Sequence, residues 1–208
     1  MEGLTKIMHA AVELFLQYGF KNVTMDDIAR RAGISKKTLY QHYANKHDVV
    51  SASVTWYQDL KLASIKAVLD SASNAIEALV RVDHELAGIY RKLNPVAMLE
   101  LQRFYPEGYE RFRQVLLTQD VEMIRQTVKR GIEEGLFRPE LDPDFTARYR
   151  IETALMCLQS NLMVNDRYSL MQVGFAITEM FIYGIVTPKG EKLYTRYKEK
   201  YCQKPIKA

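Results

Sequence analysis

The chain has 208 residues, of which 48% are hydrophobic and 26% are charged. This composition supplies enough apolar side chains for a sizeable core and excludes a disordered chain. The longest uncharged stretch, from Thr153 to Asn165, falls short of the roughly 18 to 20 apolar residues that span a membrane. The N-terminus shows no basic segment followed by a sustained apolar run, so we expect no secretory signal and predict a cytoplasmic protein.

The net charge of +4 conceals an uneven distribution along the chain. Residues 1–47 contain seven basic and four acidic residues (+3), residues 48–188 contain 15 and 19 (−4), and residues 189–208 contain seven and two (+5). A short basic N-terminal segment favours an anionic partner such as DNA, although ordinary solvated lysines give the same count. The arrangement of the residues has to decide between the two.

The first 47 residues show three short helical patterns, each with start and stop signals. In the second, Thr24 and Asp27 have the spacing of a capping box, and Gly33 follows the last apolar position. Ser35 is the predicted N-cap of the third helix, and Asn45 opens a fourth. The first pattern is an apolar face that ends near Gly19 and consists of Leu4, Ile7, Met8, Ala11, Val12 and Phe15.

Two short helices joined by a glycine turn are typical of a helix-turn-helix, here over residues 24–43. At 100° per residue, the second of these helices directs Leu39 and Tyr43 into the core. The opposite face could read base edges in a major groove, while its flanks suit phosphates; alternatively, a polar face of this kind is simply solvated. The outward residues are Lys37, Thr38 and Gln41, and the flanking ones are Lys36, Tyr40 and His42.

These residues resemble the DNA-binding signature of the TetR family of bacterial transcriptional regulators. The resemblance is carried by TMDDIARRAGISKKTLYQHY at 24–43, NKHDV at 45–49, AAVELF at 10–15 and YGF at 18–20. It implies that Thr24 and Tyr40 contact phosphates, that Lys46 holds the DNA backbone, and that the segment from Ser35 to His42 faces the operator. The chain departs from the family pattern at Lys37, Gln41 and Tyr43, so the bases read here cannot be copied from another member.

Beyond residue 50 the resemblance concerns architecture only, and helical patterns follow one another. We predict helices over 49–69, 75–93, 96–104 (stopped by Pro106) and 108–134, with Gly131 as a weak point, and find no strand alternation. The fold class is therefore all-α, with about nine or ten helices. We expect three regions: a DNA-binding domain at 1–47, a helical effector-binding and dimerisation domain at 48–188, and a basic tail at 189–208.

The last two apolar segments before this tail are apolar over more than one stripe, which indicates burial on two sides. One side could face a second subunit, as a two-fold dimer on a palindromic operator requires; the alternative is a helix pair central to the monomer core. The residues predicted for the dimer interface are Phe145, Tyr149, Met156, Met163, Val173, Gly174, Ile177, Phe181 and Gly184.

Aromatic and methionine side chains in the middle segments could line an apolar pocket for a small effector, or could be ordinary core. The resemblance implies that such an effector changes the separation of two DNA-binding heads and so releases DNA. The predicted ligand-binding residues are Tyr90, Met98, Phe104, Tyr105, Tyr109, Phe112 and Met123. The polar candidates in the same segments, which could equally be surface residues, are His84, Glu100, Gln102 and Arg103.

The sequence contains no motif for catalysis, so we predict no enzyme, no cofactor and no metal. Cys157 and Cys202 are too few and too far apart for a disulfide framework or a zinc site. We predict a dimeric, effector-released repressor. The alternative is a helical adaptor whose N-terminal unit or trigger is a protein partner. For the basic tail we favour a solvated helix over an additional contact to an anion.

Overall fold

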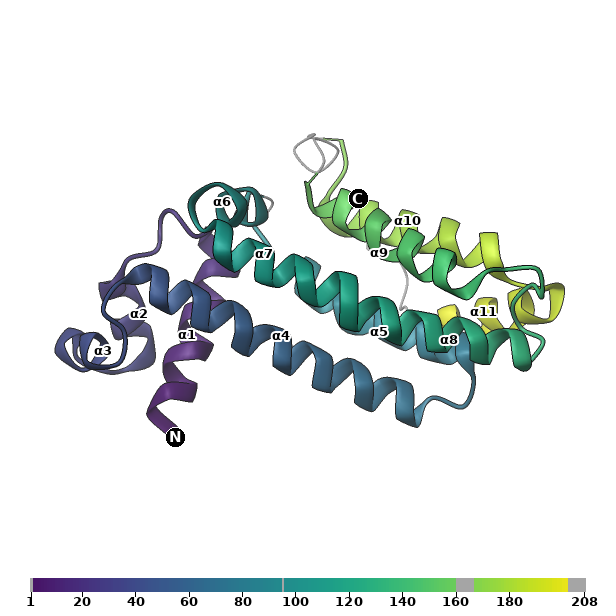
Figure 1. Ribbon diagram of the computed structural model, residues 1–208, viewed down its shortest axis with the longest axis horizontal. Helices are drawn as coiled ribbons and strands as arrows, with labels where there is room; N and C mark the ends of the chain where they lie inside the picture. The colour runs from purple at the N-terminus through teal and green to yellow at the C-terminus, as the bar shows by residue number, and fades with distance from the viewer. Residues whose placement is uncertain (1, 95, 160–166, 202–208) are drawn as a thin grey trace. The chain divides into compact units, whose positions relative to one another are not determined.

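The computed structural model describes residues 2–94, 96–159 and 167–201, and in these residues helices predominate (Figure 1). In the described residues, β-structure is limited to one isolated antiparallel bridge between Phe137 and Val186. The predicted all-α fold class is confirmed. The helices are α1 (Glu2–Tyr18), α2 (Met25–Ala32), α3 (Lys36–His42), α4 (Lys46–Ser71), α5 (Ala75–Tyr90), α6 (Ala97–Phe104), α7 (Pro106–Val115), the π-helix η1 (Leu116–Asp120), α8 (Val121–Glu133), α9 (Pro143–Gln159), α10 (Leu170–Ile185) and α11 (Pro188–Tyr201).

The chain folds into two compact units. Unit 1 comprises Met1–Lys61 and Lys92–Val115, and unit 2 comprises Leu62–Arg91 and Leu116–Ala208. This division differs from the predicted boundary after residue 47. Among the described helices, none is both long enough and apolar enough to cross a bilayer.

Local signals in the sequence account for the first three helices of unit 1, which lie together at the purple-to-blue end of the chain (Figure 1). Thr24 and Asp27 form the expected capping box at the start of α2. Gly33 ends this helix in the left-handed conformation (φ 70°), and the Ile34 N–H donates to the Ala29 carbonyl as in a Schellman motif. Ser35 caps α3 by accepting a hydrogen bond from the Thr38 N–H at 3.0 Å.

The residues around α6 belong to unit 1 because they bond to α1. The Asn94 N–H donates to the Leu16 carbonyl at 2.6 Å, and α6 contacts α1. α7 packs on α4, since the Arg111 guanidinium donates to Thr55 Oγ1 at 2.8 Å. These long-range contacts lie between segments that periodicity treats separately, which is why the predicted boundary differs.

The helix predicted over 96–104 does end at Phe104, ahead of Pro106. Two details differ from the sequence-based expectation. Pro106 itself begins the next helix, α7, where its missing N–H costs nothing. The predicted helix over 108–134 contains a π-helical turn at Leu116–Asp120 and ends at Glu133. Gly131 is no weak point, because the ring of Phe137 packs directly over it.

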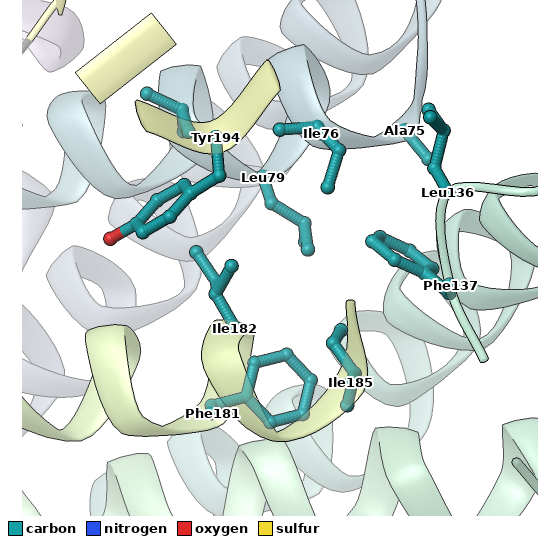
Figure 2. Packing of buried hydrophobic residues seen from close by; sticks show 10 residues of the cluster. Ala75, Ile76, Leu79, Leu136, Phe137, Phe181, Ile182, Ile185 and Tyr194 are labelled. Carbon is teal, nitrogen blue, oxygen red and sulfur yellow. The ribbon is translucent and has the colours of Figure 1, made fainter. Parts of the chain in front are cut away.

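The helices of unit 2 pack on one another around an apolar core. α5 contacts α8, α10 and α11, and α9 contacts α8 and α10. Each helix buries an apolar stripe against its neighbours, so the unit needs no sheet. Figure 2 shows side chains from α5, α10, α11 and the segment after α8 converging on this core, which includes Ala75, Ile76, Leu79, Leu136, Phe137, Phe181, Ile182, Ile185 and Tyr194.

The predicted basic tail is in fact an integral part of unit 2 as far as Tyr201. It forms the helix α11, as expected, but Tyr194 is buried in the core rather than solvated. Tyr201 donates a 2.5 Å hydrogen bond to the carboxylate of Glu77 on α5, and this bond is the largest of several causes that lower the pKa of Glu77 to about 2. The aromatic residues of the segment face the core at helical spacing, and its lysines face outward.

Candidate DNA-binding site

The scaffold of the candidate site is α3, a seven-residue helix anchored by one buried side chain. Leu39 is 0% exposed. Tyr43 follows the last residue of the helix, and its hydroxyl lies 3.9 Å from the sulfur of Met8 on α1. Burial raises the pKa of Tyr43 above its usual value. Both inward residues therefore lie where the 100° spacing predicts.

The opposite face of α3 is open to solvent. Lys37, Tyr40, Gln41 and His42 are all exposed. Lys37, Gln41 and His42 form no hydrogen bond or ion pair within the part of the chain that the structure describes. Their donors and acceptors are thus available to a ligand, and a basic helical face of this kind matches the floor of a major groove.

Other predicted contact residues already have partners within the helix-turn-helix. The Thr24 hydroxyl donates to Asp27 at 2.6 Å, and the Ser35 and Thr38 hydroxyls lie 2.8 Å apart. The Lys36 ammonium forms a 2.8 Å ion pair with Asp26, which raises the pKa of Lys36. The first two pairs cap α2 and α3, and the Lys36–Asp26 pair joins α3 to α2. A contact with DNA would have to share or exchange these partners.

Lys46 has an internal role that sequence reasoning missed. Its ammonium donates to the carbonyls of Phe20 and Lys21, in the turn after α1, and lies 5.9 Å from the ring centroid of Tyr105. Burial lowers its pKa. Lys46 therefore joins the start of α4 to the end of α1, in addition to any contact with the DNA backbone.

Glu100 on α6 is a second residue whose role the sequence did not reveal. Its carboxylate accepts a 2.9 Å hydrogen bond from the Lys21 N–H, 79 positions away. Gly19 (φ 80°) allows this approach, because a Cβ there would lie 2.5 Å from a Glu100 oxygen. The sequence signal that could have pointed here is the glycine before Phe20, whose left-handed conformation leaves room for a partner.

The predicted ligand-binding residues are not all brought together. Met98, Phe104, Tyr105, Tyr109 and Phe112 belong to unit 1, whereas Met123 belongs to unit 2, and the Tyr90 side chain lies outside the described residues. Phe104 is exposed, and Tyr105 packs against Phe20 and His47 beneath the DNA-binding helices. Tyr109 and Phe112 do lie close to each other on α7, with ring centroids 6.4 Å apart.

The predicted dimer residues divide into an exposed and a buried set. Phe145, Tyr149 and Met156 on α9 are exposed, by 70%, 53% and 47%, and Gly184 on α10 is exposed too. Ile177 is half-buried. Val173, Gly174 and Phe181 are buried inside the protomer, so they are unavailable to a partner, because α10 turns that face toward α5. Met163 lies outside the described residues. Met180 and Tyr183, which the sequence-based prediction omitted, are exposed beside this set.

An open basic helix on a capped helix-turn-helix defines a class, the helix-turn-helix DNA-binding proteins. Comparison with known proteins identifies a family within this class. Residues 7–52 match the family described as bacterial regulatory proteins, tetR family. This match confirms the predicted resemblance to the TetR family over the helices that carry the candidate DNA-binding face.

Known proteins resemble this chain over most of its length, both in sequence and in structure. The HTH-type transcriptional repressor KstR2 of Mycobacterium tuberculosis is 28% identical over 158 residues, covering 71% of this chain and 76% of KstR2. A transcriptional regulator from Cytophaga hutchinsonii has a similar structure, with a TM-score of 0.68 and 20% identity over 88% of this chain and 98% of that one. The regulator FadR from Bacillus subtilis, solved in complex with stearoyl-CoA, has a TM-score of 0.65 and 20% identity over 88% and 99%. These two likenesses concern the fold.

Proposed function

We propose that the protein is a transcriptional repressor that binds a palindromic operator as a homodimer and leaves it when a small apolar or aromatic effector binds. The observation that carries the DNA-binding part is the exposed, basic face of α3. In this proposal residues 1–47 read DNA, and the helices after residue 47 bind the effector and the second subunit. In this proposal the protein acts on its DNA operator in the cytoplasm.

Lys37 and Gln41 are the proposed base-reading residues. Both are exposed on α3, Lys37 in its first turn and Gln41 in its second, and the recognition helix is the element that enters the major groove. A lysine suits the acceptors of guanine and a glutamine suits adenine. Tyr40, on the flank, is the proposed phosphate contact, and phosphate contacts position the protein without reading sequence.

Selection of bound duplexes from random DNA, followed by mobility-shift titration, tests these roles. For Lys37→Ala or Gln41→Ala we expect a relaxed preference at the contacted bases, at a cost of about 1–3 kcal/mol on the preferred operator. For Tyr40→Phe we expect uniformly weaker binding to all sequences. Identical selected sequences and affinities for all three variants would rule out this reading face.

Lys192→Ala provides a charge-matched control for these titrations. Lys192 is exposed on α11, in unit 2, and its removal changes the net charge by the same amount as Lys37→Ala. We expect operator affinity to stay the same. A loss equal to that of Lys37→Ala would instead assign the binding to the basic C-terminal segment.

The proposed dimer is supported by the exposed apolar stripe on two neighbouring helices. Phe145, Tyr149 and Met156 recur at helical spacing on α9, and Met180 and Tyr183 add the adjoining surface of α10. Exposed apolar patches of this kind mark interaction surfaces. A two-fold dimer through them would carry two copies of α3, as two half-sites separated by a whole number of helical turns require.

The proposed effector is supported by the pair of aromatic rings on α7 and by the likeness to FadR, whose structure contains stearoyl-CoA. An effector lowers operator affinity only as far as it prefers the conformation that fits the operator poorly. Loss of a mobility-shifted complex on addition of a compound is the direct test.

The alternative, a helical adaptor whose N-terminal unit binds protein, is distinguished by salt. Binding through several phosphates releases counterions, so DNA affinity should fall steeply between about 50 and 200 mM salt. Flat salt dependence, together with no selected DNA sequence, would favour the adaptor.

A further inference from the structure

Gln58 on α4 is a buried polar side chain with an unused acceptor. It is 2% exposed, and its amide nitrogen donates to the Phe112 carbonyl on α7 at 3.2 Å. Its oxygen, Oε1, has no hydrogen-bond partner among the residues that the structure describes. The orientation of the amide is settled by chemistry: a carbonyl can only accept, so the atom that faces Phe112 must be the nitrogen.

A buried acceptor without a partner is rare in folded proteins and requires an explanation. The hydrogen bond to Phe112 alone does not supply one, because a methionine or leucine would fill the same space without leaving a polar atom unpaired. Gln58 therefore points to a donor that comes from outside the chain, either a ligand or a buried water molecule.

The surroundings favour a ligand. Gln58 lies within unit 1, where its amide bonds to the backbone of Phe112, and the Phe112 ring lies 6.4 Å from the ring of Tyr109 on the same helix. Tyr109 is 7% exposed, and Phe112 is half-buried. Apolar and aromatic side chains around a single well-placed polar atom are the usual composition of a small-molecule site.

The chemistry of the atom restricts the ligand. Oε1 is neutral and can only accept hydrogen bonds, so it favours a ligand that carries a hydroxyl or an amide N–H. An ionised carboxylate carries acceptors alone and would meet a second acceptor at this position. The nearby cation, Arg111, is directed to Thr55.

We propose that Gln58 Oε1 accepts a hydrogen bond from a neutral donor, a hydroxyl or an amide N–H, on an apolar effector that binds beside Tyr109 and Phe112. The proposal rests on the effector response proposed above and adds the chemical class that this response selects.

The experiment uses the full-length protein and a panel of matched compounds: straight-chain and phenyl-substituted alcohols and primary amides, each with its O- or N-methylated counterpart and with the acid of equal length. Binding is followed through the fluorescence of Trp56, the single tryptophan of the chain, which lies on α4 two positions before Gln58. Operator release is measured with the same compounds.

For the wild-type protein we expect the alcohols or amides that bind to do so about tenfold more tightly than their methylated counterparts, the factor that one hydrogen bond provides. Gln58→Met should abolish this preference while still binding the methylated compounds. Because it removes an unpaired acceptor, it should unfold at the same temperature as the wild type or higher. Gln119→Met, at an exposed glutamine in unit 2, should keep the preference.

Two outcomes would overturn the proposal and can be told apart. If compounds bind but the preference is absent, or survives in Gln58→Met, then Gln58 faces a water molecule and the effector response itself stands. If no member of the panel binds the wild-type protein or releases the operator, the inference fails together with the effector part of the proposed function.

Discussion

At the scale of single residues, Gly131 shows how one position decides the packing of a helix. A Cβ placed on Gly131 of α8 would lie 2.0 Å from the ring of Phe137, which is 1% exposed in the core of unit 2. The N–H groups of Leu136 and Phe137 also donate to the Gly131 carbonyl, at 2.8 and 2.9 Å. The glycine is needed because the chain folds back onto its own helix.

We therefore expect Gly131→Ala to destabilise unit 2, although alanine is the better helix former. Displacing the Phe137 ring should cost more than the gain of roughly 1 kcal/mol in helix propensity, for a net loss of about 2 kcal/mol in denaturant unfolding. Gly88→Ala in α5, where a Cβ meets nothing within 4 Å, should instead gain about 0.5–1 kcal/mol. Equal effects at both positions would contradict the packing of Phe137 over α8.

Residue patterns predicted the helix-turn-helix well, because its signals are local. The capping box of Thr24 and Asp27, the left-handed Gly33 and the Ser35 cap each involve residues within a few positions. The partners of Lys46 and Glu100 lie 25 or more positions away, and no local rule selects them. For the same reason the internal roles of these two residues could not be predicted.

At the scale of elements, α11 is held to α5 by a carboxylate at the edge of the core. Glu77 accepts hydrogen bonds from the Tyr201 hydroxyl at 2.5 Å and from the Ser73 N–H at 2.8 Å. These bonds lower the pKa of Glu77 from the ordinary 4.5 to about 2. Because the folded state prefers the ionised form, its contribution to stability is present above pH 4.5 and is lost as the pH falls toward 2.

Glu77→Gln should consequently lower the free energy of unfolding at pH 7 by up to about 3 kcal/mol, since each pKa unit corresponds to about 1.4 kcal/mol. The difference from the wild type should shrink as the pH falls from 4.5 to 2. Glu199→Gln, at an exposed position of the same α11, should change stability by less than about 0.5 kcal/mol. A deficit that is independent of pH would argue against the ionised Glu77 as the attachment point.

The elements of unit 2 also explain which of the predicted dimer residues are buried within the protomer. Periodicity showed that the last two apolar segments are buried on two sides, but not which side faces the protomer core. Phe181 lies in that core with Ile182 and Ile185 (Figure 2), whereas Met180, one position earlier, is 75% exposed. Only the packing of α10 on α5 distinguishes the two faces.

At the scale of the whole molecule, the proposed assembly depends on that exposed face. Met180→Glu should leave the protomer folded, because the side chain is already in solvent, and should prevent association by placing a charge in an apolar contact. We expect monomers in sedimentation at micromolar concentration and loss of most operator affinity. Met180→Leu should retain both properties. A dimeric Met180→Glu variant, or a monomeric wild type, would contradict the proposed interface.

The architecture of α3 has a consequence for how such proteins diversify. The helix is held by the Ser35 cap at one end and by the buried Leu39, while Lys37, Gln41 and His42 form no bond with the described remainder of the chain. Substitutions at these solvent-facing positions should change stability little. New operator preferences can therefore arise by single mutations that the fold tolerates, so that the recognised DNA sequence can drift while the scaffold stays the same.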